Sequence, residues 1–598
     1  MFLKRLWAAQ CCVPTVTECY TKRNDRMTTL IADIETDGFL HQMTLCHCLA
    51  IKDTTEDDVT IYADHAGYRP ISEGLSRLSR ADCVVFHNGI GFDIPAIVRL
   101  YGTGILDYSK VFDTLVGSRL KDSTRRGHSI KDYGRELGEE KLDYNDFTKF
   151  TDEMAEYCKV DVKITQYVYD KTKIVRDSDA YKLEADFVRV LQLQEEHGFR
   201  LDLDKANDLC SELRQEISNL EEELQDLWPS KTIERWSEKT GKRLKDKIEV
   251  FNPGSRKMIA ERLAETHDWK PKSFTPSGGP KIDEVVLSNL PYPEAKQLAR
   301  YFRVQKQLGQ LSDGDNGWLK LVRGDRVHGG VSSMGTATHR CSHFKPNMAQ
   351  VDKKDLRMRE VWVADEGQVL VGCDADALEL VCLAHYLGKY DNGVYRDALL
   401  YGSKEEGTDV HSRTQKLVEL PTRDEAKRMQ YAYLYGASDR KLASISKEAG
   451  GPLKDGKEIR KRMDEGIDGL GELSEGIQKR AKAGWFKAID GRKITIRSPH
   501  SALNFLLQSC GAIVMKKAAQ VFHYDFAVKK QLVVDGQLKG FAYVANVHDE
   551  VQFSADPDVA DVVGKTFADS ITEAAVRLGM RCPLSGTYEI GDNWKETH

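Results

Sequence analysis

The 598-residue sequence lacks any apolar run close to the roughly 20 residues that a membrane-spanning helix needs. Its most apolar stretch, residues 369–387, is interrupted by Asp374, Asp376 and Glu379. The thirteen cysteines show no paired CxxC spacing, and Cys46 and Cys48 are separated by a single residue, so a zinc centre is not indicated. These absences argue against an integral membrane protein and favour a cytoplasmic chain with free thiols.

An excess of positive charge is also missing. The formal net charge is −6, with 30% charged and 41% hydrophobic residues, as expected for a soluble globular protein. The charge is nevertheless uneven, because residues 296–345 hold nine Lys or Arg against three Asp, interleaved with Tyr301, Phe302 and Trp318. Such a segment fits contact with a nucleic-acid backbone, and the alternative is a solvated face.

A chain of this length exceeds one hydrophobic core and is expected to form several domains, without internal repeats. Residues 1–26 have little pattern and are interpreted as a dispensable leader. Alternating strand and helix patterns from residue 28 to about 179 predict an α/β domain. Residues 182–227 predict helices broken at His197-Gly198, and residues 228–280 predict loops plus a short helix after Asn252-Pro253. With the mixed remainder, the chain is predicted to be a multidomain α/β and α+β protein.

Four carboxylates form a first candidate site. Asp33 and Glu35 are two residues apart in a predicted strand, residues 29–35, and so project from one face, where two like charges are costly without a cation. Asp93 follows a predicted strand at residues 84–86. Asp161 stands four residues after Tyr157 on one face of a predicted helix. Each feature alone is common on protein surfaces, but together they predict a site for hard divalent cations.

Further carboxylates mark a second candidate site. Asp374 follows a predicted strand, residues 368–373, whose end can hold a carboxylate toward a cleft. His548-Asp549-Glu550 lie between predicted strands at residues 541–547 and 551–553. A polar hairpin tip is usually only a turn, but this one is acidic and lies between apolar strands.

A helix predicted at residues 422–436 lies between these carboxylates in the sequence. Thr422 and Glu425 form a capping box, and Gly436 is a plausible stop. One face carries a series at intervals of four: Arg423, Lys427, Tyr431 and Tyr435. Cations near the start of a helix suit a phosphate group, and a ring further along can stack on a sugar or base. The alternative is an exposed basic helix with core tyrosines.

The first set of carboxylates resembles the three exonuclease motifs of proofreading domains, which have an RNase H-like fold. The resemblance implies two Mg²⁺ ions about 3.5–4 Å apart, with Tyr157 orienting the attacking water. The implied ligands are Asp33, Glu35, Asp93 and Asp161.

The later motifs resemble motifs A, B and C of family A DNA polymerases, nearest to the T-seven-type bacteriophage replicative branch. Supporting stretches are residues 338–342, 346–350, 409–411, 497–500 and 593–594. The resemblance extends over about residues 28–598. It implies an RNase H-like 3′–5′ exonuclease domain at 27–180 and a right-hand polymerase domain at 181–598. The thumb would span about 181–325, and the palm and fingers about 326–598.

The same resemblance implies roles for the polymerase residues. Asp374 and Asp549 would hold two Mg²⁺ ions, for which Mn²⁺ can substitute, with Glu550 beside them. Glu379 would block a ribose 2′-hydroxyl, and Tyr431 would pack on the incoming sugar. The other implied contacts to substrate come from Arg423, Lys427 and His411 at the triphosphate, from Tyr435 and His548, and from Arg340, Asn504 and Gln508 at the minor groove.

The implied partners are primer–template DNA, dNTPs, a phage helicase-primase and a single-strand binding protein, in the cytoplasm of an infected bacterium. The sequence departs from the pattern at Val381, where arginine is usual, and at Asp376, an additional carboxylate. A third departure is the short segment 227–251, where the phage relative carries a large thioredoxin-binding insertion. This segment is basic, so contact with duplex phosphates is expected in place of thioredoxin.

Three alternatives are less favoured. A single-subunit RNA polymerase shares the motif order, but Glu379 and the nuclease motifs are unexpected in it. An inactive DNA-binding scaffold should have lost metal carboxylates, and all of them are present. A stand-alone nuclease leaves the helix at residues 422–436 unexplained.

Overall fold

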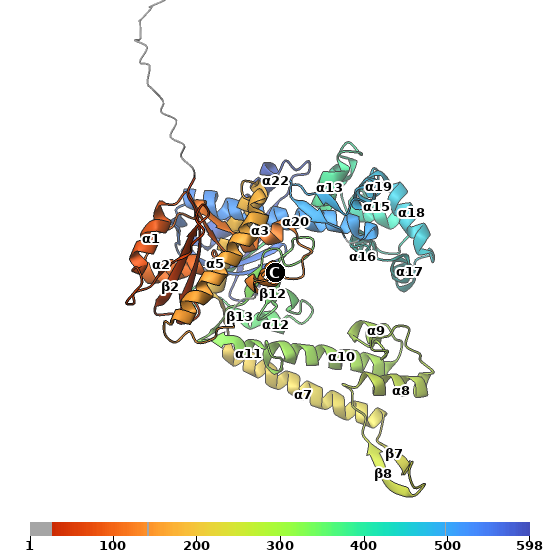
Figure 1. Cartoon of the computed structure of the whole chain (residues 1–598). Coiled ribbons are helices and arrows are strands. Elements are labelled where there is room, and N and C mark those ends of the chain that lie inside the picture. Colours follow the sequence, from red (N-terminus) through yellow and green to blue (C-terminus); the bar gives the residue numbers. More distant parts are fainter. Residues whose placement is uncertain (1–26, 140–142, 497, 598) are drawn as a thin grey trace, which may run out of the picture.

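The computed structural model of the chain describes residues 27–139, 143–496 and 498–597 (Figure 1). The predicted leader, residues 1–26, and Arg497 lie outside the described residues. Figure 1 shows an N-terminal α/β unit beside a central region that contains α20 and α22, with two helical projections extending from it. One projection contains α7, α8 and α10, and the other contains α15 to α19.

The N-terminal unit is built on a five-stranded sheet with the order β3-β2-β1-β4-β5. The strands are β1 (Thr29–Thr36), β2 (Cys46–Asp53), β3 (Thr60–Tyr62), β4 (Cys83–Phe86) and β5 (Val111–Asp113). β1 pairs antiparallel with β2 and parallel with β4, so the sheet is mixed. Separate apolar clusters pack on its two faces, with the helices α1 (Ile71–Arg80), α2 (Asp93–Tyr101), α3 (Thr114–Lys121), α4 (Ile130–Leu137) and α5 (Asp152–Thr172) around it. The predicted α/β domain is confirmed.

Two long helices follow and meet at the predicted break. α6 (Asp179–His197) ends at Gly198, whose φ of 76° suits a residue without a side chain. α7 (Leu203–Leu227) begins after a short strand, β6 (Phe199–Leu201), which the sequence did not reveal. β6 lies between β13 (Trp362–Val363) and β10 (Arg326–Val327) in a four-stranded sheet completed by β9 (Val322–Arg323). Beside it, Trp318, Trp362 and Trp594 are almost completely buried in one cluster.

The thumb-like projection pairs α7 with α10 (Pro293–Leu308), and α8 (Arg256–His267) and α9 (Glu284–Ser288) lie at its far end (Figure 1). The prediction that residues 227–251 form only a basic loop is wrong. They contain a two-stranded hairpin, β7 (Lys231–Trp236) and β8 (Arg243–Glu249), which projects beyond the end of α7. Gly241 in its turn has a φ of 63°. The many lysines obscured an alternating strand pattern that includes Ile233 and Ile248.

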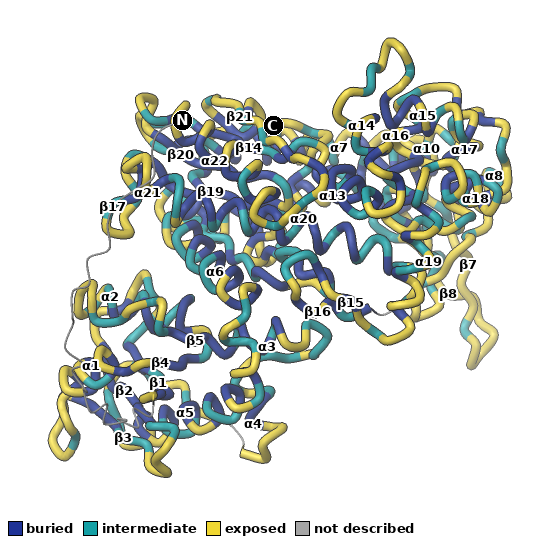
Figure 2. Tube along the Cα trace, turned by 90° about the horizontal axis from the view of Figure 1, so that it is seen from above, coloured by how far each residue is buried: buried dark blue, intermediate teal, exposed yellow. Residues whose placement is uncertain are grey.

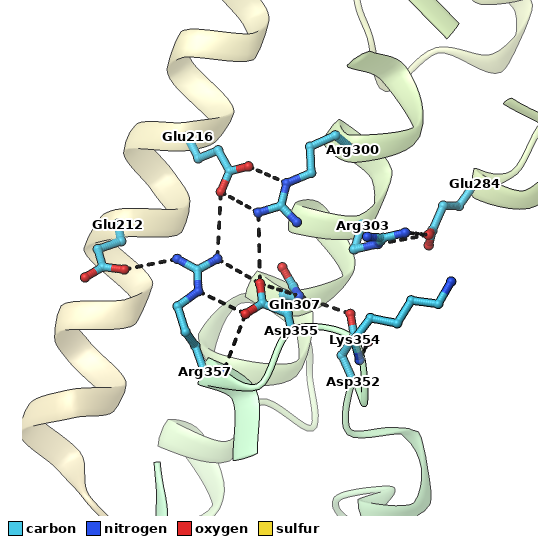
Figure 3. Close-up of polar contacts among 10 residues, drawn as sticks. All are labelled: Glu212, Glu216, Glu284, Arg300, Arg303, Gln307, Asp352, Lys354, Asp355 and Arg357. Carbon is cyan, nitrogen blue, oxygen red and sulfur yellow. Dashed lines mark hydrogen bonds and ion pairs between the residues drawn. The ribbon is translucent and has the colours of Figure 1, made fainter. Parts of the chain in front are cut away.

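Ion pairs fasten this projection at its base (Figure 3). Arg357 bonds Asp355 at 2.7 Å and Glu212 of α7 at 3.1 Å, while Arg300 of α10 donates to Glu216 of α7 at 2.8 Å. Gln307 of α10 donates to both Asp352 and Asp355. The network therefore joins both long helices to the segment 352–357.

These pairings reduce the positive charge predicted to meet nucleic acid. Of the nine cations in residues 296–345, Arg300, Arg303, Arg326 and Arg340 form ion pairs, and Lys320 donates to backbone carbonyls. Within the described residues, the remaining four have no ion pair: Lys296, Lys306, Arg323 and Lys345. Contact of these four with a phosphate backbone stays a prediction.

The central sheet has the order β19-β20-β14-β21, and all of its strands are antiparallel to their neighbours. Its strands are β14 (Val369–Ala375), β19 (Phe541–Val547), β20 (Glu550–Ala555) and β21 (Gly586–Gly591). α22 (Pro557–Arg577) packs against the sheet and against α20 (Ala502–Val521), which also contacts α13 (Leu378–Leu387). The predicted strands around Asp374 and Asp549 are confirmed.

The second projection is helical: α14 (Val394–Tyr401), α15 (Val410–Leu417), α16 (Arg423–Leu434), α17 (Asp439–Glu448), α18 (Gly456–Gly466) and α19 (Leu470–Ala481). A hairpin, β15 (Trp485–Lys487) and β16 (Lys493–Thr495), returns the chain to α20. Figure 2 shows α20 as a largely buried element between this projection and the central sheet. One apolar cluster, which includes Val381, joins both regions.

Two further findings concern the cysteines and the lengths of the apolar helices. Every cysteine in the described ranges is a free thiol. Among the residues that the structure describes, no helix combines the length and the apolarity needed to cross a membrane.

Candidate active sites

The first carboxylate group lies on β1, α2 and α5. Asp33 is half-buried on β1, whereas Glu35 on the same strand, Asp93 at the start of α2 and Asp161 on α5 are buried. Burial, reinforced by the charge of Asp33, raises the pKa of Asp93 well above its ordinary value. A fold that buries acidic groups this close together favours binding of a cation there.

The structure adds Cys158 to this group, and sequence reasoning missed it. Possible ligand atoms of Asp33, Glu35 and Cys158 all lie within 4.8 Å of one another, and the Cys158 thiol is 3.5 Å from Asp33 Oδ2. Asp93 and Asp161 lie outside this tight set of three, and the charge of Asp33 still acts on Asp93. Cys158 directly follows Tyr157 on α5, and this position next to the motif could have identified it from the sequence.

Tyr157 and the loop before Asp93 are each held by side chains from other segments of the α/β unit. The Tyr157 ring packs on Tyr144 and Phe147, with centroids 5.7 and 6.1 Å away. The loop is fixed by Asp113, whose buried carboxylate accepts hydrogen bonds from the backbone N–H groups of Asn88 and Ile90 at 3.1 Å. Asp113 also caps α3. Its role could not be inferred from the sequence, since an Asp at a strand end is a common helix cap.

The second carboxylate group forms where β14 passes the β19–β20 turn. Asp374 is paired with Glu550 in the sheet, and the backbone N–H of Ala375 donates to the Asp549 carbonyl at 3.2 Å. Burial, together with the charges of Asp549 and Glu550, raises the pKa of Asp374 to about 7. Burial and Glu379 raise the pKa of Asp549 as well. Asp374 Oδ1 is buried with no hydrogen-bond partner in the described part of the chain, and this oxygen-only set fits a hard divalent cation.

Glu550 and Asp376 have structural partners of their own. The buried Glu550 carboxylate accepts hydrogen bonds from Trp594 Nε1 and from Gln552 at 2.9 Å, with Arg359 at 3.6 Å. Asp376 accepts from Ser585 at 2.6 Å and from Thr587 at 3.2 Å, which ties β21 to the segment after β14. The additional carboxylate therefore has a role in holding the sheet edge.

α16 begins and ends as predicted. The Thr422 hydroxyl accepts from the Glu425 backbone N–H, and Gly436 after the helix has a φ of 75°. Lys427 is exposed and forms no ion pair with any described residue. Arg423, by contrast, donates twice to one oxygen of Asp409, at 2.9 and 3.1 Å. Burial opposes ionisation of Asp409, but hydrogen bonds from Arg423 and Ser412 outweigh it and lower the pKa to about 2.

The remaining predicted substrate residues lie on or near α13, α15, α16, α20 and the β19–β20 turn. Glu379 accepts from Arg340 at 2.9 Å and from Tyr435 at 2.6 Å. Asn504 Nδ2 donates to the Tyr435 carbonyl, and Gln508 accepts from Thr338. The Tyr431 ring stacks on Tyr435 and lies 6.3 Å from the His411 ring. His548, with a φ of 60°, stands at the β19–β20 turn, and burial lowers its pKa.

An antiparallel sheet that presents paired aspartates beside a helix with an exposed lysine and stacked tyrosines is typical of the class of right-hand nucleic-acid polymerases. The family is then given by similarity: DNA polymerase family A matches residues 214–596, and the chain belongs to that family. The DNA-directed DNA polymerases of Enterobacteria phage T3 and Escherichia phage T7 are each 29% identical, over 95% of this chain and 100% of the relative. DNA polymerase I of Aquifex aeolicus is 24% identical over 87% of this chain and 89% of that protein.

Among solved structures, the POL domain of Pol1 from M. smegmatis, in complex with DNA primer-template and dNTP, has a similar fold. The TM-score is 0.72 at 18% identity, over 96% of each chain.

The raised pKa of Asp374 predicts a pH-dependent cost to stability. A folded-state pKa of about 7, above the ordinary 3.8, means that the protonated carboxyl stabilises the fold at low pH and that this contribution is lost as the pH rises toward 7. In EDTA at pH 8, Asp374→Asn should raise the free energy of unfolding by roughly 1–2 kcal/mol, after allowance for solvent screening. The gain should vanish near pH 4, as thermal melts can measure. Asp315→Asn, at an exposed aspartate, is the control, and an equal gain at both pH values would contradict the assignment.

Proposed function

We propose that this family A polymerase extends a DNA primer on a DNA template and removes mispaired 3′ ends at a separate 3′–5′ exonuclease site. The observation that carries the proposal is the proximity of Asp374 and Asp549 to Glu379 and to the end of α16, where Tyr431 lies and where Tyr435 donates to Glu379. We assign residues 27–180 to the exonuclease and 181–598 to the polymerase. In the latter, about 181–325 form the thumb and about 326–598 the palm and fingers.

Two Mg²⁺ ions at each site, replaceable by Mn²⁺, fit the donor atoms. Asp374 and Asp549 would hold the pair at the polymerase site, and at the exonuclease site the ligands would be Asp33, Glu35, Asp93 and Asp161. When bound, such a pair neutralises charge on the attacking and leaving oxygens of an in-line phosphoryl transfer. The pKa of about 7 for Asp374 supports the fit, because a cation relieves the repulsion that raises it.

The side chains of this chain would orient the polymerase substrates. Lys427, which forms no ion pair with described residues, would bind the triphosphate together with His411 and Arg423. Arg423 is held in place by its hydrogen bonds to Asp409. Tyr431 would pack on the sugar. Glu379 is fixed by Arg340 and Tyr435, which makes it a rigid obstacle to a 2′-hydroxyl. The primer-terminal base pair would be contacted by four side chains, those of Arg340, Asn504, Gln508 and His548.

A cavity of about 730 Å³ lies beside the loop that precedes Asp93, and its lining includes the carboxylates of Asp113, Glu195 and Glu196 but none of the four proposed metal ligands. It lies between the α/β unit and the hairpin β11 (Gly330–Ser332) and β12 (Ser342–Phe344). Aromatic rings and cations without ion pairs among the described residues line it: Phe39, Phe92, Phe344, Arg99, Arg119, Arg323 and Lys345. Rings that stack on bases and cations that bind phosphates are typical of sites for single-stranded DNA.

Similarity to the T3 and T7 phage polymerases over nearly the whole chain supports a role in copying a phage genome. A helicase-primase and a single-strand binding protein would be its partners there. Proofreading complements copying, because one recognition step based on small contacts discriminates by only about 10–200-fold.

Separate active sites predict separable activities. Asp374→Ala or Asp549→Ala should reduce primer extension by about 10²–10³-fold or more while primer degradation continues. Asp33→Ala combined with Glu35→Ala should do the reverse. Gel assays of a labelled primer, with and without dNTPs, measure both activities. Substantial extension by Asp374→Ala in Mg²⁺ would refute the assignment of the polymerase site. Persistent degradation by Asp33→Ala with Glu35→Ala would show that the nuclease site lies elsewhere.

Sugar selection should depend on the bulk of Glu379. Glu379→Ala should raise the ratio of kcat/KM for NTP over dNTP by roughly 10–100-fold, because it opens space for a 2′-hydroxyl. Glu379→Gln preserves the bulk and is the matched control, since both variants weaken the pairing with Arg340. Equal ratios for the two variants would show that charge or pairing, and not bulk, excludes the ribonucleotide.

The β7–β8 hairpin should bind duplex phosphates. Lys239, Lys242 and Lys245 form no ion pairs with described residues, and Trp236 is 58% exposed. Replacing these three lysines by Gln should shorten products in single-encounter extension. It should also reduce the slope of log affinity against log salt concentration by about 2–3.

The matched control replaces Lys529, Lys530 and Lys539 by Gln, near α21 (Ala527–Lys529) and away from the hairpin (Figure 2). Added thioredoxin should not lengthen the products. Equal shortening by both triple variants, or much longer products with thioredoxin, would contradict the prediction.

A further inference from the structure

Four ionised side chains lie together in the interior, outside both carboxylate sites. Glu184 comes from α6, Lys516 from α20, and Arg492 and Asp490 from the β15–β16 turn. Glu184 Oε1 accepts from Arg492 and, at 2.7 Å, from Lys516 Nζ, while Arg492 Nε donates to Asp490 at 2.7 Å. Their side chains are between 0% and 4% exposed, so water screens none of these interactions strongly.

The group is electrically balanced, with two carboxylates and two cations. Burial opposes ionisation of Glu184, but the charges of Lys516 and Arg492 outweigh it and lower the pKa of Glu184 to about 2. Loss of one member would leave an uncompensated charge in the interior. The group therefore has one well-defined arrangement.

Lys516 extends this arrangement to the backbone before Arg340. Its Nζ also donates to the carbonyls of Ser333 at 2.7 Å and His339 at 2.9 Å, and Arg492 lies 3.2 Å from His339 Nδ1. His339 has a φ of 58°, a left-handed conformation that is unfavourable for a residue with a side chain. Such a backbone persists only where its surroundings over-determine it, and these hydrogen bonds supply that constraint.

The next residue, Arg340, is the one that binds Glu379. We infer that Glu184 is a positioning residue for nucleotide addition, acting through Lys516 on the turn at His339 that presents Arg340 to the primer terminus. This inference rests on the proposed polymerase function. It assigns a role in nucleotide addition to a residue outside the polymerase motifs, on a helix that directly follows the α/β unit.

The test measures extension of matched and mismatched primers by the full-length protein. A phosphorothioate at the last primer linkage protects the end from the nuclease. Glu184→Gln should lower kcat for matched primers by about 10–100-fold, because a small displacement of a contact group has effects of that size. The KM for dNTP should change little, because Glu184 does not contact α16. The ratio of matched to mismatched extension should fall toward the ratio that Arg340→Ala gives. Glu184→Gln combined with Arg340→Ala should lower this ratio no further than Arg340→Ala alone.

Asp186→Asn is the matched control. Asp186 lies on the same helix and accepts from Gln520 of α20 at 2.6 Å, but it does not contact Lys516. This variant should keep the wild-type ratio. An equal loss in Asp186→Asn would overturn the inference, because packing of α6 on α20 would then explain the effect.

A second variant guards against misfolding. Glu184→Gln with Lys516→Met removes one charge of each sign, so the buried charges stay balanced, while the carbonyls of Ser333 and His339 lose their donor. Melting temperature and degradation of unmodified single strands confirm that it is folded. The low ratio should persist, and a wild-type ratio in this variant would overturn the inference. Absence of extension by the wild-type protein would instead refute the proposed function.

Discussion

Repulsion between buried carboxylates is the constraint around which both sites are built. Asp93, which lies beside Asp33, and Asp374, which lies beside Asp549 and Glu550, both have raised pKa values because burial and like charges oppose ionisation. Short strands in the interior of a sheet can hold such groups in place, since their ladders prevent the side chains from moving apart. A bound cation would relieve this repulsion, so the proposed metal sites would gain affinity at the expense of the stability of the metal-free fold.

The buried charges beneath the polymerase site follow the opposite rule. Glu184, Arg492, Lys516 and Asp490 neutralise one another, so they need no external ion and fix geometry. α6 contacts the N-terminal α/β unit through Tyr181, one turn before Glu184. The Tyr181 hydroxyl accepts a hydrogen bond from the backbone N–H of Asp113 at 2.6 Å. One helix thus supports the loop before Asp93 and the turn before Arg340. Packing of α6 therefore sets the backbone next to both candidate sites.

Features determined by neighbours in sequence could be predicted, and features determined by distant pairing could not. The strand with Asp33, the helix with Tyr157 and the capped start of α16 all follow from local periodicity and hydrogen bonding. Glu184 gave no such signal, because its partners stand 308 and 332 residues away in the sequence. The proximity of Cys158 to Asp33 likewise depends on how α5 packs on β1. The β7–β8 hairpin was not predicted because its many charged residues mask the strand pattern in the sequence.

Internal pairing also explains how an acidic chain can present a basic surface. In the thumb-like projection, the arginines bind the acids of α7 and of segment 352–357, as Figure 3 shows for Arg300 and Arg357, and this fixes the angle between the helices. Arginine suits this task because its planar fork can bond two carboxylates at once. The cations without ion pairs among the described residues, Lys296 and Lys306 on α10 and Lys239, Lys242 and Lys245 of the hairpin, are exposed. Paired arginines therefore shape the projection, and the exposed lysines are the cations available for the proposed contacts with phosphates.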